Sequence, residues 1–147
     1  MPFNLSLMAK HGHLFSAAIG TVPVAAAAGT RNGAAINRRG NGGLAMGCTV
    51  VVTTGVTTGA PTSFAVNTKL QDSPDGASSW ADYIPPDLTT VAAAPPITTA
   101  SGISGMVVNL TGAKQYIRAV EVTTFVGGTS PTVNVQAAAV LYGFDRT

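Results

Sequence analysis

Hydrophobic and polar residues alternate along much of this chain. The clearest run extends from Ser63 to Gln71, where Phe64, Val66 and Leu70 occupy alternate positions and mostly polar residues lie between them. Because successive side chains of a β-strand point to opposite faces, such a run has one apolar face and one polar face. It therefore predicts a half-buried strand.

Three other runs also predict strands. Cys48 to Thr54 is rich in β-branched residues and ends at Gly55, which is typical of a strand buried on both faces or in an interface. Gln115 to Val126 alternates throughout, and Thr132 to Tyr142 places Val and Ala residues on one face, opposite Asn and Gln. Together the four runs indicate a protein built from strands.

Clusters rich in glycine and proline separate these runs. They occupy residues 39–43, 58–62, 73–76 and 127–131. Several strands separated by such turns predict an all-β fold, an antiparallel sandwich or barrel of jelly-roll or immunoglobulin-like type. The run from Phe125 to Val135 is expected to form a hairpin around its GGTSP turn.

Two segments do not follow the alternating pattern. Residues 1–30 are expected to form an extended N-terminal arm or a first strand that takes part in an interface, and residues 31–147 a single β domain. Residues 84–101 contain two Pro-Pro pairs and predict a long loop that crosses between the halves of the sheet. Such a loop is usually functional or bound to a partner.

The chain carries little charge for its length. Only 10% of its 147 residues are charged, 46% are hydrophobic, and the net charge is +2. A monomer this poor in charge tends to associate, so we expect a homo-oligomer. The basic residues are too few and too scattered for a nucleic-acid surface. No apolar stretch reaches the roughly 18 residues of a membrane span, and Gly20 and Pro23 interrupt the only segment that resembles an export signal.

Residues that could carry catalysis or bind a metal are few. His11 and His13 have no acid or cysteine close in sequence, so a polar segment is expected there rather than a metal site. Cys48 lies in an apolar run and is expected to be a buried hydrophobic residue rather than a reactive thiol. Residues 102–105 lack the spacing of a serine nucleophile elbow. We therefore expect a protein that is not an enzyme and has no metal or cofactor.

Arg38 and Arg39 precede a glycine-rich turn that could in principle hold an anion. Phosphate-binding glycine loops run into a helix, whereas this turn runs into the β-branched strand. We expect a turn at the edge of the sheet, with the two arginines free to pair with acids of a neighbouring subunit.

The segment Lys69–Tyr83, KLQDSPDGASSWADY, looks most like a site. Asp72, Asp75 and Asp82 lie on or beside a turn, where aspartates normally accept bonds from the local backbone instead of converging for acid–base chemistry. The segment comes close to the Asp-box motif of sialidase-like propellers through Ser73, Asp75, Gly76 and Trp80. The glycine, however, comes one position early and the motif occurs once in a chain too short for a propeller.

A hairpin corner is the simpler interpretation of this segment. Pro74 and Asp75 suit the central positions of a turn, and Gly76 suits the left-handed conformation that follows. Trp80 and Tyr83 are then expected on the returning strand, packed beside Phe64, Val66 or Leu70. Alternatively, Trp80, Tyr83 and Tyr116 form an exposed aromatic platform for a carbohydrate.

Several stretches together resemble a known class of protein. They are AINRRG at 35–40, GAPTSF at 59–64, LQDSPDGASSWADY at 70–83, GAKQYIR at 112–118 and GGTSP at 127–131. Over residues 34–143 the chain resembles small virion proteins of tailed phages and prophages, of the capsid decoration (cement) or minor capsid type. The resemblance implies a non-enzymatic β-rich protein, made in the cytoplasm of the bacterial host, that binds the major capsid protein on the outside of the virion and braces the shell.

A trimer is the favoured oligomer. A trimer bound to the shell through one subunit would hold its other binding surfaces at high effective concentration. Eleven residues are candidates for interfaces with the shell or with other copies: Phe3, Leu5, Leu7, Arg38, Arg39, Trp80, Tyr83, Pro85, Pro86, Pro95 and Pro96. The alternatives are a neck, tail or fibre-attachment protein of the virion, and a carbohydrate-binding adhesion module that uses exposed aromatic residues.

Overall fold

All regular secondary structure in the described part of the chain is β-strand. The computed structural model describes residues 15–40 and 43–145. The strands are β1 (Phe15–Ala26), β2 (Gly29–Asn32), β3 (Ile36–Asn37), β4 (Arg39–Gly40), β5 (Gly43–Thr58), β6 (Ser63–Ser73), β7 (Ala81–Asp82), β8 (Ala93–Ile97), β9 (Ile103–Asn109), β10 (Tyr116–Val126) and β11 (Thr132–Asp145). The described residues contain no helix, so the predicted all-β class is confirmed.

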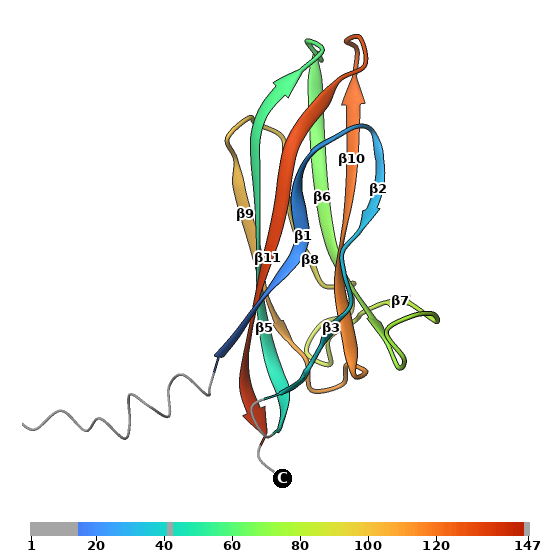
Figure 1. The fold of residues 1–147 in the computed structure, drawn as a ribbon, viewed down its shortest axis with the longest axis vertical. Coiled ribbons are helices and arrows are strands. Elements are labelled where there is room, and N and C mark those ends of the chain that lie inside the picture. Colours follow the sequence, from blue (N-terminus) through green and yellow to red (C-terminus); the bar gives the residue numbers. More distant parts are fainter. Residues whose placement is uncertain (1–14, 41–42, 146–147) are drawn as a thin grey trace, which may run out of the picture.

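The strands form two antiparallel sheets that pack face to face in an elongated sandwich (Figure 1). The first, here the β5 sheet, has the order β1-β11-β5-β9, with β4 beside β5 at one end. The second, here the β6 sheet, has the order β2-β10-β6-β8, with β3 beside β10 and β7 beside β6. The predicted sandwich is therefore confirmed.

The pairing pattern selects one of the two predicted topologies. Among the eight longer strands, β1 pairs with β11, β2 with β10, β5 with β9 and β6 with β8. The pairs are nested, so the first strand meets the last, the second meets the seventh, and the central two meet each other. This arrangement is the jelly roll, a double sheet of eight strands with two Greek keys.

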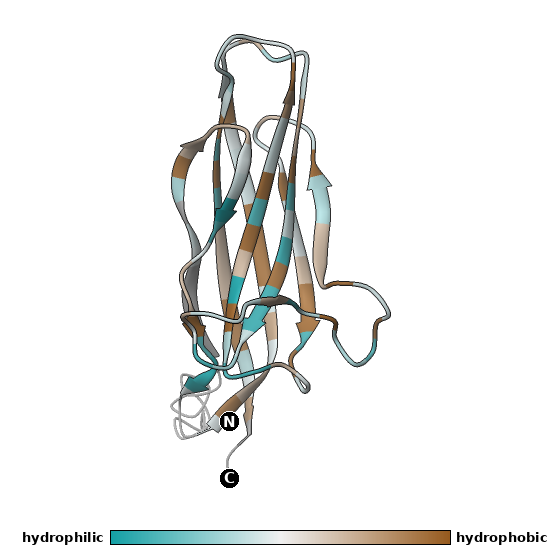
Figure 2. Ribbon diagram, turned by 90° about the vertical axis from the view of Figure 1, so that its right-hand side faces the viewer, coloured by the Kyte–Doolittle hydropathy of each residue, from teal (hydrophilic) through white to brown (hydrophobic). Residues whose placement is uncertain are grey.

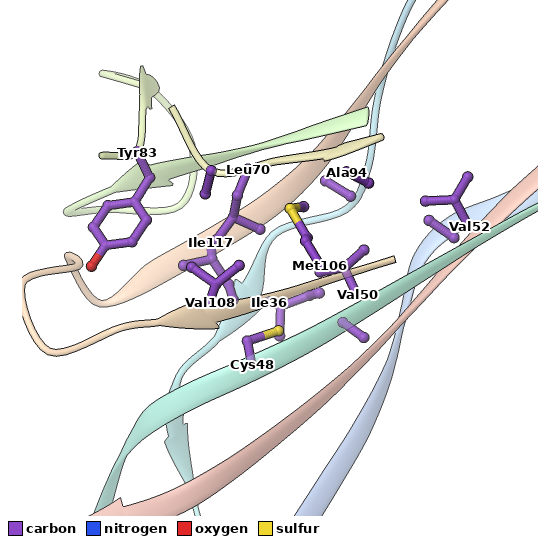
Figure 3. Packing of buried hydrophobic residues seen from close by; sticks show 14 of the residues in the cluster. Ile36, Cys48, Val50, Val52, Leu70, Tyr83, Ala94, Met106, Val108 and Ile117 are labelled. Atoms are coloured by element: carbon purple, nitrogen blue, oxygen red, sulfur yellow. The ribbon is translucent and has the colours of Figure 1, made fainter. Parts of the chain in front are cut away.

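Alternation along the strands places the core between the sheets. Phe64, Val66 and Leu70 of β6 are buried on one face, as predicted. The inward row of β11 is also the predicted one: Val133, Val135, Ala137, Ala139 and Leu141. Figure 2 shows the resulting change of colour along each long strand, and Figure 3 shows residues of both sheets meeting in the core. Cys48 lies at 0% exposure in this core.

The predicted hairpin around GGTSP is wrong. Strand β10 belongs to the β6 sheet and β11 to the β5 sheet, so residues 127–131 cross from one sheet to the other. Residues 59–62 cross beside them from β5 to β6, at the same end of the molecule (Figure 1). The two connections are bonded together, since Thr129 N donates to Gly59 O at 2.8 Å and Thr62 N to Val126 O at 2.8 Å.

Strands occur in both segments that do not follow the alternating pattern of the sequence. The described part of residues 1–30 takes the first-strand alternative, because β1 pairs along β11 from Phe15 to Ala26. The segment 84–101 is not all loop, since β8 lies within it and pairs with β6. Strand β8 contains both Pro95 and Pro96, which lie at the shift of register between its pairs Ile97–Val66 and Ala94–Thr68 and take no part in the ladder.

Candidate functional site

The corner at residues 73–80 is held by hydrogen bonds to one carboxylate. Asp75 accepts bonds from the backbone N–H of Ala77 at 3.0 Å and of Ser78 at 2.9 Å, and from the hydroxyls of Ser73 at 2.8 Å and Ser78 at 2.6 Å. These bonds, chiefly those from Ser78, hold the pKa of Asp75 well below its ordinary value. Gly76 has φ +72°, as the turn predicted from the sequence requires. The corner is therefore a structural turn.

Substituting Asp75 with asparagine should reduce the loss of stability in acid. A carboxylate whose pKa falls on folding contributes stability above its unfolded pKa of about 4, and this contribution is lost as the pH falls from there toward the folded value. Thermal melts of wild type and D75N at pH 7 and pH 3 measure the difference. The drop in melting temperature should be smaller in D75N than in wild type. An equal drop in D75N and wild type would contradict this role for Asp75.

Polar side chains cross three strands on the outer face of the β6 sheet. Asp82 accepts bonds from Lys69 Nζ at 2.7 Å and Gln71 Nε2 at 2.8 Å, and Gln71 Oε1 accepts two bonds from Arg118 at 3.0 and 2.7 Å. The Arg118 guanidinium also lies 4.3 Å from the centre of the Trp80 ring. The hydrogen bond from Lys69, followed by the one from Gln71, lowers the pKa of Asp82. These groups satisfy one another and do not converge on a common ligand.

The aromatic residues do not form the platform that the carbohydrate alternative needs. Tyr83 is buried, packs near Leu70 (Figure 3), and donates its hydroxyl to Asn109 O at 2.7 Å, so its predicted packing in the core is confirmed and its role as an exposed aromatic is not. Burial raises the pKa of Tyr83. Trp80 packs against Arg118 instead of joining the core, which corrects the prediction that it lies beside the 63–71 strand residues.

Arg38 is buried in its own chain, which corrects its assignment to a subunit interface. It has 0% exposure and donates five hydrogen bonds to four backbone carbonyls, those of Ala45, Leu110, Ala113 and Lys114. Its guanidinium therefore joins the start of β5 to the turn before β10. Arg39, by contrast, is exposed, so only one arginine of the predicted pair lies at the surface.

A second polar group is buried between the sheets. Glu121 of β10 lies at 0% exposure and accepts hydrogen bonds from Thr21 Oγ1 at 2.5 Å and from Arg31 Nε at 2.9 Å. Arg31 also donates to Val135 O at 3.1 Å, and Ala137 N donates to Thr21 Oγ1 at 2.8 Å. The network links β1, β2, β10 and β11, and the sequence pattern alone did not indicate it.

In the part of the chain that the structure describes, no group of three or more His, Cys, Asp or Glu could hold a metal ion. Asp72 is engaged by Lys114, from N at 2.9 Å and Nζ at 3.1 Å, so it does not pair with another carboxylate. Desolvation raises the pKa of Cys48 to about 12, which keeps its thiol protonated and unreactive.

A shallow depression of about 440 Å³ lies on the β5 sheet near its crossing end. Eight residues line it: Pro23, Val24, Thr53, Thr54, Gly55, Asn134, Val135 and Gln136. The lining has two hydroxyls, those of Thr53 and Thr54, and no acidic or basic side chain that could activate them.

The remaining residues predicted to lie at interfaces differ in their exposure to solvent. Pro85 is buried, whereas Pro86, Pro95 and Pro96 are exposed and remain available for contacts. Phe3, Leu5, Leu7, His11 and His13 lie outside the described residues.

The outer face of the β5 sheet was not predicted from the sequence as a candidate binding surface. Three adjacent strands present outward residues that all lack charge: Thr49, Val51 and Thr53 of β5, Ile103, Gly105 and Val107 of β9, and Gln136, Ala138, Val140 and Tyr142 of β11. Ile103 is 73% and Val107 75% exposed. The outward residues of these three strands thus form an uncharged, partly apolar surface, which Asp87 borders beside Val107 and Tyr142. The β6 sheet instead has a face crossed by ion pairs and hydrogen bonds. An uncharged face of this kind is a candidate surface for contact with another macromolecule.

No model of a known protein family matches this chain, and no curated protein matches it either. Within the described residues, no helix is long and apolar enough to cross a membrane.

Proposed function

We propose that this chain is a non-enzymatic virion protein that binds the outside of an assembled phage capsid and stabilises it. The proposal rests chiefly on the uncharged outer face of the β5 sheet, which offers a broad surface to a protein lattice. It is supported by the resemblance of residues 34–143 to small phage virion proteins. Its partner would be the major capsid protein, and its location the exterior of the virion.

The internal chemistry of the sandwich agrees with a binding role. The buried polar side chains Arg38, Glu121 and Asp72 are engaged by groups of the same chain. They hold strands together and are not aimed into a cavity. The jelly roll itself occurs in viral capsid proteins and in lectins alike, so the fold is compatible with the proposal without carrying it.

The proposal is tested by adding the purified chain to empty expanded shells of the phage that encodes it, followed by sedimentation of the shells. Saturable binding is expected. A138E places a charge at an exposed position on the proposed binding face and should abolish binding, whereas N67E, at an exposed position on the other face, should not. Absence of wild-type binding, or equal binding by both variants, would contradict the proposed surface.

A further inference from the structure

Three of the four edge strands carry features that prevent pairing with another chain. Edge strands expose unpaired N–H and C=O groups, and proteins protect them with prolines, charges, irregular register or short length. Strand β1 has Pro23 and two shifts of register, β8 has Pro95 and Pro96, and β2 is four residues long and contains Arg31. Strand β9 has neither proline nor charge, and its seven pairs with β5 run without a shift.

The backbone of β9 directs alternate residues outward. Thr54 N donates to Gly102 O at 2.9 Å and Leu110 N to Met46 O at 2.8 Å. These bonds join residues directly opposite in the ladder, so the even-numbered residues of β9 face β5. The N–H and C=O groups of Ile103, Gly105 and Val107 therefore point away from the sheet. Among the described residues, no backbone hydrogen bond is formed by these outward groups.

The residues at the same three positions are also exposed to solvent. Ile103 and Val107 are the two most exposed large hydrophobic residues of the described chain, and Gly105 between them is exposed. Strand β9 lies at the outer margin of the sandwich in Figure 1, with no described segment beyond it in that view. Backbone bonding capacity and apolar surface therefore coincide on one unprotected edge.

We propose that β9 pairs with β9 of a second copy of this chain, antiparallel and centred on Gly105. In this register Gly105 meets Gly105 of the second copy, and Ile103 meets Val107 of the second copy on both sides of the two-fold axis. All three positions have outward backbone groups, so the three pairs exchange six hydrogen bonds. The contact joins two β5 sheets into one continuous sheet.

The edge suits a second copy because it is complementary to itself. A two-fold contact requires the same strand to supply donors and acceptors in matching positions, and the alternation around Gly105 does so. Strand β9 itself carries no charge, so its own side chains bring no like charges together across the axis. A single contact of this kind closes at two copies, so it produces a dimer and not the trimer expected from the sequence.

The dimer is expected to be weak in free solution. One seven-residue edge buries less than the roughly 1,200 Å² of a standard stable interface. We therefore expect dissociation in about the 10–1,000 µM range. This pairing does not depend on the proposed capsid role and would persist if that role were disproved.

The register is tested by analytical ultracentrifugation of the full chain up to about 1 mM, a concentration set by the weak association expected. In I103K/V107K, lysines meet lysines across the axis twice, and the dimer should weaken at least tenfold. In I103K/V107E, each lysine meets a glutamate of the second copy, and dimerisation should be retained. V126K, which charges an exposed hydrophobic residue at the crossing end, should match wild type.

Each other outcome overturns the proposal. A wild-type chain that stays monomeric at the highest concentration has no such contact. Equal weakening by both double variants excludes the proposed register, and no weakening by I103K/V107K excludes β9. Deletion of residues 1–13 should leave the dimer intact, and its loss would show that the N-terminal segment, not a second β9, occupies the edge.

Discussion

Replacing Arg38 with alanine is expected to destabilise the protein by about 4 kcal/mol or more. The side chain supplies five hydrogen bonds to four backbone carbonyls in a region without access to solvent. Each buried carbonyl left without a donor costs about 1–3 kcal/mol, and water cannot replace the guanidinium without opening the end of the sandwich. Because domains are stable by only about 5–15 kcal/mol, the loss is a large share of the total.

Chemical denaturation of the purified variant measures this loss. R39A is the matched control, because it removes an exposed arginine one residue away and should change stability by less than about 0.5 kcal/mol. The stability of R38K should lie between those of R38A and R39A. The lysine ammonium keeps the charge but lacks the planar guanidinium that reaches four carbonyls. If R38A is too unstable to purify, R38K against R39A still decides the matter. Equal stability of R38K and R39A would contradict the assigned role.

Replacing Glu121 with leucine is expected to cost about 3–5 kcal/mol. The carboxylate is the acceptor for Thr21 and Arg31 between the sheets, and leucine removes it while leaving the arginine charge partly buried. Removing one member of a buried ion pair is costly because the other charge loses its compensation. In a chain of this length, the melting temperature should fall by roughly 10 °C.

The variant E121Q distinguishes the contribution of the hydrogen-bond network to stability from that of side-chain packing. Thr21 and Arg31 donate to different oxygens of Glu121, and E121Q keeps one of these two acceptors, so it should be more stable than E121L in the same thermal melt. A leucine variant as stable as wild type would show that the network contributes nothing to folding.

Strand positions could be predicted because they depend on local pattern. In β6 and β11 every second residue faces the core, and this alternation is visible in the sequence whatever the rest of the fold does. The connections could not be predicted in the same way. The glycine-rich turn at 127–131 has the composition of a hairpin, yet it crosses between sheets, because the partners of β10 and β11 lie far away in sequence.

The burial of polar residues depends on partners distant in sequence. Arg38 and Arg39 are adjacent and identical in type, but Arg38 meets carbonyls more than seventy residues away and Arg39 faces solvent. Trp80 and Tyr83 also lie in different environments, since the Tyr83 hydroxyl donates to Asn109 O and Trp80 packs against Arg118. No local pattern distinguishes the two members of either pair.

The exposed face was missed for a related reason. In β9, Met106 and Val108 are buried whereas Ile103 and Val107 are exposed, although all four are hydrophobic. Alternation normally marks the buried face by its apolar residues, and β9 has apolar residues on both faces. Only the position of the strand at the sheet edge shows which of them remain available for a partner.

The capsid-stabilising role is tested most directly by the melting temperature of empty expanded shells with and without the purified chain. A protein that binds the assembled lattice and not its dissociated subunits must raise that temperature, increasingly with concentration until the sites are filled. Such a rise is expected for wild type and none for A138E. A wild-type chain at saturating concentration that leaves the shell melting temperature unchanged would contradict the capsid-stabilising role.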